Sequence, residues 1–195
     1  MSFLLKDLNY TNEAFAYAEN ALTDDEIKLI EKLAIDSTMQ GDGTLENGIS
    51  NDEIRKNKIS WLELREESKE IYLKIANIVR HLNDKFYRYD LVEMEDLQYA
   101  EYHSHDLGHY KTHSDDGYHY NLFRKISVTI QLSDETEYNG GELLFYRFST
   151  MDPTVAPKRK GTLILFPSYV LHEVTPVTKG SRKSLVTWIL GPRFR

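Results

Sequence analysis

Two segments in the first half of the chain show the spacing of apolar residues that is typical of amphipathic helices. The first is expected over about residues 24–36, and Thr23 with Glu26 forms a capping box, in which each side chain satisfies a free backbone N–H group. The second is expected over about residues 65–84, with charged residues opposite its apolar stripe. The stripe residues are Ile27, Ile30, Leu33 and Ala34 in the first segment and Ile71, Ile75, Ile78, Val79 and Leu82 in the second. Both helices should therefore cover a sheet.

From Tyr87 onward the apolar period changes towards two, which is typical of strands. Strands are expected over about 87–93, 96–103, 126–132, 142–149, 161–166 and 183–190. Helices followed by many strands predict an α+β fold with a β-sandwich or barrel core. Between the two predicted helices, residues 37–53 are rich in glycine, asparagine and small polar residues, so we expect an irregular connection there that could act as a lid.

The length of 195 residues suits one domain, with a helical part over about 1–85 and a β core over about 86–192. No window approaches the roughly 18 consecutive apolar residues of a membrane span, and the apolar stretch at the start of the chain is too short for a signal peptide. We therefore expect a cytoplasmic protein without membrane contact. A net charge of -7 argues against a nucleic-acid partner, which usually requires a basic face.

The chain has no cysteine, so disulfides, thiolate zinc sites and iron–sulfur clusters are excluded. Any metal must be held by histidines and carboxylates. His113 and Asp115 are two residues apart, and on an extended segment their side chains point to the same face. His172, which follows a predicted strand and a turn, could supply a second imidazole. Two histidines and one carboxylate leave coordination positions open, as non-haem Fe(II) requires, although zinc hydrolysis could use the same ligands.

Arg182 stands ten residues after His172, with Ser184 on the same face of a predicted strand. A guanidinium can hold the distal carboxylate of 2-oxoglutarate through two hydrogen bonds, and a serine hydroxyl can add a third. Alternatively, Arg182 could be a solvated turn residue beside Lys179 and Lys183. The spacing from His172 favours the carboxylate anchor.

The candidate metal and carboxylate ligands belong to a longer series of short sequence motifs along the chain. The series comprises Ile54-Arg55-x-x-Lys58-Ile59-x-Trp61, Arg80-His81-x-Asn83, Tyr110-x-x-His113-x-Asp115, Gly140-Gly141-Glu142-Leu143, and His172-Glu-Val-x-Pro176 leading to Arg182 and Trp188. Over about residues 54–190 the chain resembles the prolyl-4-hydroxylase-like branch of the 2-oxoglutarate oxygenases, and especially the hypoxia-sensing prolyl hydroxylases and their bacterial relatives. The resemblance implies a double-stranded β-helix, also called a jelly roll, of antiparallel strands with N-terminal helices packed on one side.

The resemblance also implies roles for individual residues. Fe(II) would be held by the two histidines and the aspartate, with 2-oxoglutarate and O2 as cosubstrates and ascorbate as an optional reductant. Tyr102 would meet 2-oxoglutarate near its metal-bound end, Arg182 would pair with its far carboxylate, and Trp188 would wall the site. Tyr110 and Arg124 would lie towards the substrate, and Arg55 would belong to a flexible segment that closes over a peptide.

This sequence departs from the family pattern at three points near the cosubstrate. Gln131 stands where the hypoxia-sensing enzymes have a tyrosine that assists the arginine, and Ser184 replaces a small apolar residue. The segment from Tyr102 to His113 is one residue longer. These departures imply a rearranged carboxylate pocket.

The activity implied by the resemblance is hydroxylation of a prolyl residue in a peptide or protein, with release of succinate and CO2. One alternative is hydroxylation of a free amino acid or another small metabolite, and a second is a metal-containing jelly roll that only binds ligands. Other residues are expected to be structural: His103, His105, His109 and His119 at the rim, His81 near a helix end, and Gly140-Gly141 in a hairpin turn with positive φ.

Overall fold

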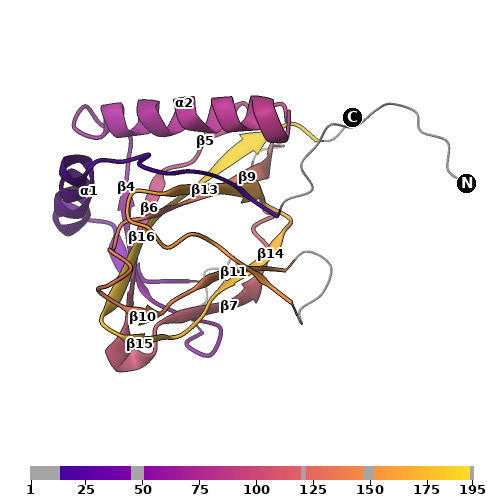
Figure 1. Cartoon of the computed structure of the whole chain (residues 1–195). Coiled ribbons are helices and arrows are strands. Elements are labelled where there is room, and N and C mark those ends of the chain that lie inside the picture. Colours follow the sequence, from indigo (N-terminus) through magenta and orange to yellow (C-terminus); the bar gives the residue numbers. More distant parts are fainter. Residues whose placement is uncertain (1–13, 45–50, 120–121, 147–151, 194–195) are drawn as a thin grey trace, which may run out of the picture.

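The computed structural model describes residues 14–44, 51–119, 122–146 and 152–193. Within these ranges the chain forms two long helices, two larger antiparallel sheets that lie in layers, and a separate two-stranded sheet (Figure 1). None of the helices in the described ranges is long and apolar enough to cross a membrane.

Helix α1 (Asp24–Asp36) begins and ends where the sequence predicts. The capping box is present, because Thr23 Oγ1 accepts a hydrogen bond from the Glu26 backbone N–H at 3.3 Å and Glu26 Oε2 accepts one from the Thr23 N–H at 2.7 Å. The Glu26 carboxylate also accepts hydrogen bonds from Lys74 Nζ on the second helix at 2.7 and 2.8 Å, so one residue caps α1 and ties it to its neighbour.

Helix α2 (Lys69–Phe86) starts about four residues later than predicted and ends two residues later. The delay arises because Arg65–Ser68 forms a separate turn, in which Ser68 Oγ accepts from the Arg65 N–H at 2.9 Å. The helix ends where Arg88 takes a positive φ of 57° and donates its backbone N–H to Asn83 O at 2.7 Å. The predicted apolar stripe packs inwards: Ile71, Ile75, Val79 and Leu82 are buried and Ile78 is partly buried.

The larger sheet, called the major sheet here, runs in the order β1-β13-β9-β16-β6-β4-β2, with β5 paired to β16 and β8 to β9. Its strands are β1 (Ala16–Ala18), β2 (Gln40–Asp42), β4 (Lys58–Leu62), β5 (Glu93–Met94), β6 (Leu97–His103), β8 (Tyr118–His119), β9 (Leu122–Gln131), β13 (Leu163–Pro167) and β16 (Ser181–Gly191). The smaller sheet, called the minor sheet, runs in the order β12-β11-β14-β7-β3. Its strands are β3 (Arg55–Lys56), β7 (His109–His113), β11 (Leu143–Tyr146), β12 (Thr154–Val155) and β14 (Leu171–Val174), and β10 (Asn139–Gly140) pairs separately with β15 (Val177–Lys179). A short 3-10 turn, Ser104–Asp106, links β6 to β7.

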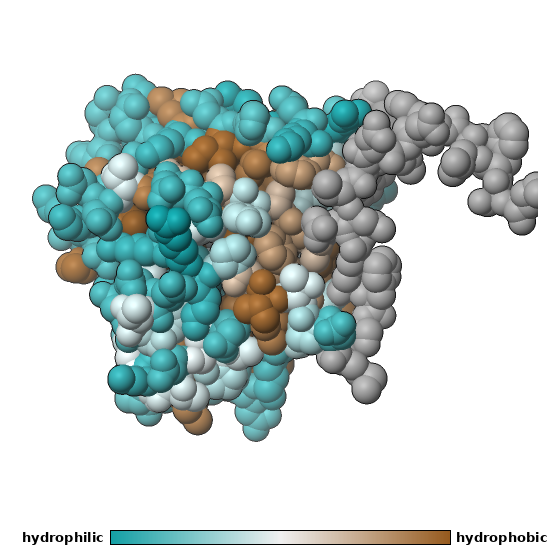
Figure 2. All heavy atoms as spheres, viewed as in Figure 1, coloured by the Kyte–Doolittle hydropathy of each residue, from teal (hydrophilic) through white to brown (hydrophobic). Residues whose placement is uncertain are grey.

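Two apolar clusters occupy the two faces of the major sheet. The first lies between this sheet and the helices and includes Ile75 of α2 and Val128 of β9, both fully buried. The second lies between the two sheets, where Phe166 of the major sheet and Phe145 of the minor sheet meet with ring centroids 4.7 Å apart. Figure 2 shows hydrophobic residues in the middle of one face, below α2, framed by hydrophilic ones. The expected α+β fold with a β-sandwich core is therefore confirmed.

Several predicted boundaries are wrong, and each has a local cause. Residues 87–93 do not form the expected strand, since only Glu93–Met94 pair with β16, while the backbone N–H and C=O of Tyr89 are both bound by the Asn83 side chain. The 37–53 connection contains strand β2, which pairs with β4. Residues 45–50 of that connection and 147–149 of a predicted strand lie outside the described residues.

Gly140 and Gly141 have positive φ values of 73° and 61°, as expected, but they do not form a hairpin turn. The strands on either side pair with different partners, β10 with β15 and β11 with β14. A Cβ at Gly140 would lie 2.1 Å from Pro176 O, so the backbone passes too close here for any side chain. The two glycines thus allow the chain to change sheets.

The capping box predicts how strongly α1 depends on Thr23. Replacing Thr23 by alanine removes the acceptor for the Glu26 N–H, and it should lower the free energy of unfolding by about 1 kcal/mol. Urea denaturation followed by circular dichroism measures this difference. Thr38→Ala, an exposed threonine beyond the other end of the helix, is the control and should change stability little. Equal midpoints for Thr23→Ala and the unmodified protein would contradict the assignment.

Candidate metal and carboxylate site

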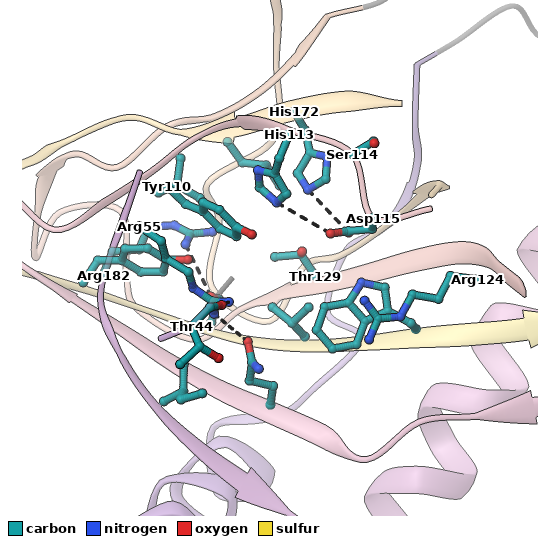
Figure 3. A pocket seen from close by; sticks show the side chains of 18 of the residues that line it. Thr44, Arg55, Tyr110, His113, Ser114, Asp115, Arg124, Thr129, His172 and Arg182 are labelled. Atoms are coloured by element: carbon teal, nitrogen blue, oxygen red, sulfur yellow. Dashed lines mark hydrogen bonds and ion pairs between the residues drawn. The ribbon is translucent and has the colours of Figure 1, made fainter. Parts of the chain in front are cut away.

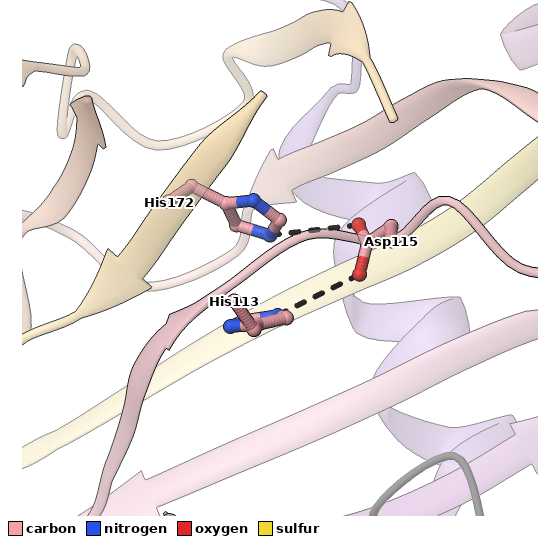
Figure 4. Close-up of side chains that lie close together, drawn as sticks. All are labelled: His113, Asp115 and His172. Atoms are coloured by element: carbon pink, nitrogen blue, oxygen red, sulfur yellow. Dashed lines mark ion pairs between the residues drawn. The ribbon is translucent and has the colours of Figure 1, made fainter. Parts of the chain in front are cut away.

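His113 and His172 lie opposite each other on neighbouring strands of the minor sheet. His113 ends β7, and its cross-strand partner in β14 is His172. Directly opposed residues of an antiparallel pair project to the same face, and the two imidazole centroids are 4.2 Å apart. Both rings point into the space between the sheets, towards Asp115 (Figure 4).

Asp115 follows β7 and is held by its backbone and its carboxylate. Its N–H donates to Ser168 O at 2.8 Å, and Ser127 Oγ on β9 donates to Asp115 Oδ2 at 2.7 Å. Ser127 also bonds the Ser168 hydroxyl at 3.0 Å. Both sheets therefore contribute to the position of this carboxylate.

The tautomers of the two histidines follow from their backbone contacts. His113 Nδ1 lies 2.8 Å from Lys111 O and His172 Nδ1 lies 2.9 Å from Val170 O. A carbonyl oxygen only accepts hydrogen bonds, so each Nδ1 carries a proton and Nε2 is the ring nitrogen that can bind a metal. Carbonyl groups orient metal-binding histidines in the same way.

The free Nε2 atoms face the Asp115 carboxylate. His113 Nε2 is 3.6 Å from Oδ1 and His172 Nε2 is 3.5 Å from Oδ2. The three ligand atoms lie within 4.8 Å of one another. Two imidazoles and one carboxylate that converge in this way fit a divalent ion such as Fe(II) and leave further coordination positions for other ligands.

Electrostatics favours the ligand state of these groups at neutral pH. Burial lowers the pKa of His113 to about 4, with a smaller contribution from the nearby His172, so its imidazole is neutral at pH 7. Burial alone would raise the pKa of Asp115, but His172, His113 and the Ser127 hydroxyl together hold it below its usual value. The carboxylate is therefore ionised. A metal would displace no proton from either group.

Arg182 projects from β16 of the major sheet, and its side chain is fully buried, with only 1% of the residue exposed. Its Nη2 donates to Gln131 Oε1 at 3.0 Å and its Nη1 to Ser184 Oγ at 3.3 Å, and the guanidinium lies 5.4 Å from the Tyr102 ring centre. All three neighbours are uncharged. Among the described residues no carboxylate pairs with Arg182, so its buried positive charge has only neutral hydrogen-bond partners there, and an anion bound beside it would be stabilised.

The metal ligands and Arg182 open into one cavity of about 260 Å³ between the sheets (Figure 3). The predicted site residues that line it are Arg55, Tyr102, Tyr110, His113, Asp115, Arg124, His172, Arg182, Ser184 and Trp188. Gln131 does not line the cavity but bonds Arg182 from behind, with its own Nε2 donating to Pro157 O at 3.1 Å. About half of the residues that line the cavity are therefore among the predicted site residues.

Arg55 lies in a paired strand, and the expectation that its segment closes over a peptide stays a prediction. It lies in β3, which pairs with β7, and only 8% of the residue is exposed. Its guanidinium donates to Asn57 Oδ1, Thr44 O and Gln98 Oε1 at 2.8 to 2.9 Å, and it lies 4.7 Å from the Tyr110 ring centre. The side chain is fixed against the cavity wall.

Arg124 lies at the other end of the cavity. It donates to both oxygens of Glu95 at 2.7 Å, and its guanidinium lies 3.9 Å from the Trp188 ring centre. The positive charge of Arg124 is thus already balanced, and the residue presents a stacked Arg–Trp surface to the cavity.

The remaining histidines lie away from the metal ligands. His103 bonds Ser181 Oγ, His109 bonds Leu107 O, and His105 and His81 are largely exposed. The side chain of His119 lies outside the described residues. These observations agree with the expectation that none of the four described residues is a ligand.

The sequence interpretation missed several residues that shape the cavity, although one signal was available. In β9 the polar residues Ser127, Thr129 and Gln131 alternate with the apolar Ile126, Val128 and Ile130. The polar set is buried and faces the site, while the apolar set packs under the helices. Polar residues at every second position of a buried strand therefore mark the inner face. Thr44 and Gln98 also line the cavity, and nothing in their local sequence indicated it, whereas Trp61 stood in the motif series without an assigned role.

Part of the chain is similar to known oxygenases. Residues 97–190 match the model of the 2OG-Fe(II) oxygenase superfamily. A PKHD-type hydroxylase of Idiomarina loihiensis is 36% identical over 81 residues, which cover 42% of this chain and 36% of that protein. A PKHD-type hydroxylase of Colwellia psychrerythraea is 41% identical over 85 residues, which cover 42% of this chain and 37% of that protein. The matched region is thus little more than a third of each relative's length.

Solved structures resemble almost the whole chain. A prolyl hydroxylase from Trichoplax adhaerens, in complex with a peptide of the hypoxia-inducible factor oxygen degradation domain, gives a TM-score of 0.75 at 20% identity and covers 91% of this chain and 84% of that one. A prolyl-4-hydroxylase from Pseudomonas putida gives 0.70 at 19% identity and covers 94% and 95%. Identities this low establish the fold alone. Residues 97–190, a little under half of the chain, are similar to the 2OG-Fe(II) oxygenase superfamily, and the fold of the chain is the double-stranded β-helix of the prolyl hydroxylases.

Proposed function

We propose that the chain is an Fe(II)- and 2-oxoglutarate-dependent dioxygenase that hydroxylates a C–H bond. One observation carries the proposal: three metal-ligand side chains converge on one side of a cavity whose other side holds a buried arginine with no carboxylate partner among the described residues. Bound Fe(II) would supply the oxidative chemistry, in which O2 hydroxylates the substrate while 2-oxoglutarate is converted to succinate and CO2.

In this proposal, different residues of the cavity wall bind the metal, bind 2-oxoglutarate and exclude water. His113, Asp115 and His172 would hold the metal, and Arg182 would pair with the distal carboxylate of 2-oxoglutarate, with Ser184 and Gln131 fixing the guanidinium. Tyr102 and Trp188 would enclose the cosubstrate. Both are at least nine-tenths buried, so they would also keep bulk water from the reacting groups.

The buried Arg182 distinguishes this proposal from two alternative functions that would use the same metal ligands, namely a zinc hydrolase and a ligand-binding jelly roll. A zinc hydrolase needs only the metal and its water, and a ligand-binding jelly roll with a structural metal needs no open coordination position. Neither explains a guanidinium buried in a neutral setting beside the metal ligands. A dicarboxylic cosubstrate explains it, because one end can reach the metal while the other pairs with Arg182.

We further propose that the substrate is a prolyl residue in a peptide or protein, with a free amino acid or other small metabolite as the alternative. Support comes from the related folds, which include the Trichoplax enzyme solved with a peptide fragment and a viral collagen prolyl hydroxylase of Paramecium bursaria Chlorella virus-1. Tyr110, Arg124 and Arg55 would face the substrate. Since Arg124 is paired with Glu95, it would offer a flat surface with Trp188 to a proline ring.

Alanine at either metal-binding histidine should abolish Fe(II)-dependent conversion of 2-oxoglutarate to succinate, because two remaining ligands hold the ion too weakly. We expect His113→Ala and His172→Ala to lose at least a hundredfold in succinate production, and to lose Mn(II) binding measured by calorimetry. The matched control is His105→Ala, an exposed histidine outside the cavity, which should behave as the unmodified protein does. Turnover retained in either ligand variant would reject that ligand.

Loss of the guanidinium should act chiefly on the cosubstrate. Arg182→Ala should raise the 2-oxoglutarate concentration needed for half-maximal turnover by at least tenfold, since truncating one partner of a buried charge pair costs about 2–5 kcal/mol. Arg182→Lys should recover only part of the affinity, because an ammonium cannot form two parallel hydrogen bonds. Steady-state kinetics with variable 2-oxoglutarate tests this. An unchanged requirement in Arg182→Ala would contradict the anchor.

The substrate class is tested by mass spectrometry. A library of proline-containing peptides and, separately, a mixture of free amino acids should be incubated with the protein, Fe(II), ascorbate and 2-oxoglutarate. We expect a gain of one oxygen on prolyl residues of some peptides, and none in reactions of His113→Ala. Oxygen gain confined to free amino acids would replace the peptide proposal by its alternative.

A further inference from the structure

Tyr138 has a buried hydroxyl without a partner, next to the carboxylate pocket. The residue lies just before β10 and is 2% exposed, in the apolar cluster between the sheets. Its hydroxyl oxygen makes no hydrogen bond among the described residues. Buried hydroxyls are almost always bonded, so a lone one calls for an explanation.

The side chain of Tyr138 packs beside Arg182. Gly141 lies against both, since a Cβ built on it would be 3.0 Å from Arg182 Cδ and 3.2 Å from Tyr138 Cε2. Burial raises the pKa of Tyr138 and the positive charge of Arg182 opposes this, so the phenol stays protonated at neutral pH and keeps its O–H as a donor. On its other face, Lys158 Nζ lies 4.4 Å from the ring centre and donates to Gly140 O. The ring is thus held in place on both sides.

Arg182 has an unused donor at the same place. Its Nε is buried and without a partner among the described residues, while its two Nη atoms bond Ser184 and Gln131. Nε is bonded to Cδ, the atom that touches Gly141 next to Tyr138. The unpaired Nε–H of Arg182 and the unpaired hydroxyl of Tyr138 therefore belong to two side chains that both lie next to Gly141.

Gln131 stands at the position where the hypoxia-sensing prolyl hydroxylases have a tyrosine that assists the arginine. The structure brings a different tyrosine to the arginine, from the segment between β9 and β10. A glutamine amide can orient the guanidinium, but with Nε2 bound to Pro157 O and Oε1 to Arg182 it has little left to offer a ligand. Tyr138 has both its donor and its acceptor free.

We propose that Tyr138 is a binding residue for the distal carboxylate of 2-oxoglutarate: its hydroxyl accepts the Arg182 Nε–H and donates its own proton to the carboxylate that Arg182 holds. A hydroxyl can do both at once. This inference rests on the proposed function. It explains why a tyrosine and not a phenylalanine occupies this buried position, because the cosubstrate supplies the missing partner.

The test measures binding to Mn(II)-loaded protein, with two ligands that differ only at the distal end. 2-Oxoglutarate carries the second carboxylate and 2-oxopentanoate lacks it. Both tryptophans of the chain, Trp61 and Trp188, line the cavity, so their fluorescence reports binding without turnover. Tyr138→Phe should weaken 2-oxoglutarate binding about tenfold, which is the value of one hydrogen bond to a charged group. Binding of 2-oxopentanoate should stay unchanged.

The control variant is Tyr99→Phe, a buried tyrosine on β6 whose hydroxyl donates to Glu101 Oε1 at 2.9 Å on the helix side of the sheet. It should bind both ligands as the unmodified protein does. Equal 2-oxoglutarate affinity in Tyr138→Phe, or equal weakening of both ligands, would overturn the role of Tyr138 while leaving the proposed function intact. If the unmodified protein bound no 2-oxoglutarate, the proposed function itself would fail. The ratio of the two affinities is insensitive to a partly unfolded sample, so a loss of stability cannot imitate the expected result.

Discussion

The site depends on the antiparallel pairing of β7 with β14, which sets His113 opposite His172. Side chains in a strand alternate between the two faces of the sheet, so a shift of one residue in either strand would turn one imidazole away from the cavity. The register is fixed by the packing around it: Phe145 on the next strand, β11, pairs with His172, and Phe166 of the major sheet packs against the His172 ring at 4.7 Å. The candidate metal ligands are thus positioned by apolar packing together with the hydrogen bonds that Ser127 and Ser168 make to Asp115.

A second constraint is the buried charge of Arg182. Moving a guanidinium into a protein interior without an anion is costly, and neutral hydrogen bonds recover only part of that cost. Ser184 and Gln131 supply such bonds, and the Tyr102 ring lies nearby. This unpaired charge lowers the stability of the ligand-free protein. It also makes the binding free energy of a carboxylate that pairs with Arg182 more favourable. Natural proteins tolerate such local costs at functional sites.

The sequence predicted the helices, most central strands and the main site residues because each leaves a local pattern. Thr23 and Glu26 mark the start of α1 by a hydrogen-bond geometry that spans only three residues. Strand β7 could not be predicted in this way. Apart from Tyr110, the residues of His109–His113 are polar, so β7 has no apolar alternation, although it carries a candidate metal ligand. Tyr138 was missed for a different reason: its contact with Arg182 joins two segments more than forty residues apart, and only the folded sheet order brings them together.

Packing of the helices against strand β16 orients side chains of the site, although the helices do not contact the site. Arg182, Ser184 and Trp188 face the cavity, whereas Leu185 and Ile189 on the opposite face pack in the cluster under α1 and α2. Lys183 also pairs with Glu31 of α1 at 2.7 Å. Because side chains alternate along one strand, the packing that holds the apolar face rigid also fixes where the guanidinium and the indole point. The two faces of the major sheet therefore have different roles. The apolar residues that stabilise the fold pack on the helix side, and the buried polar groups lie on the side of the site.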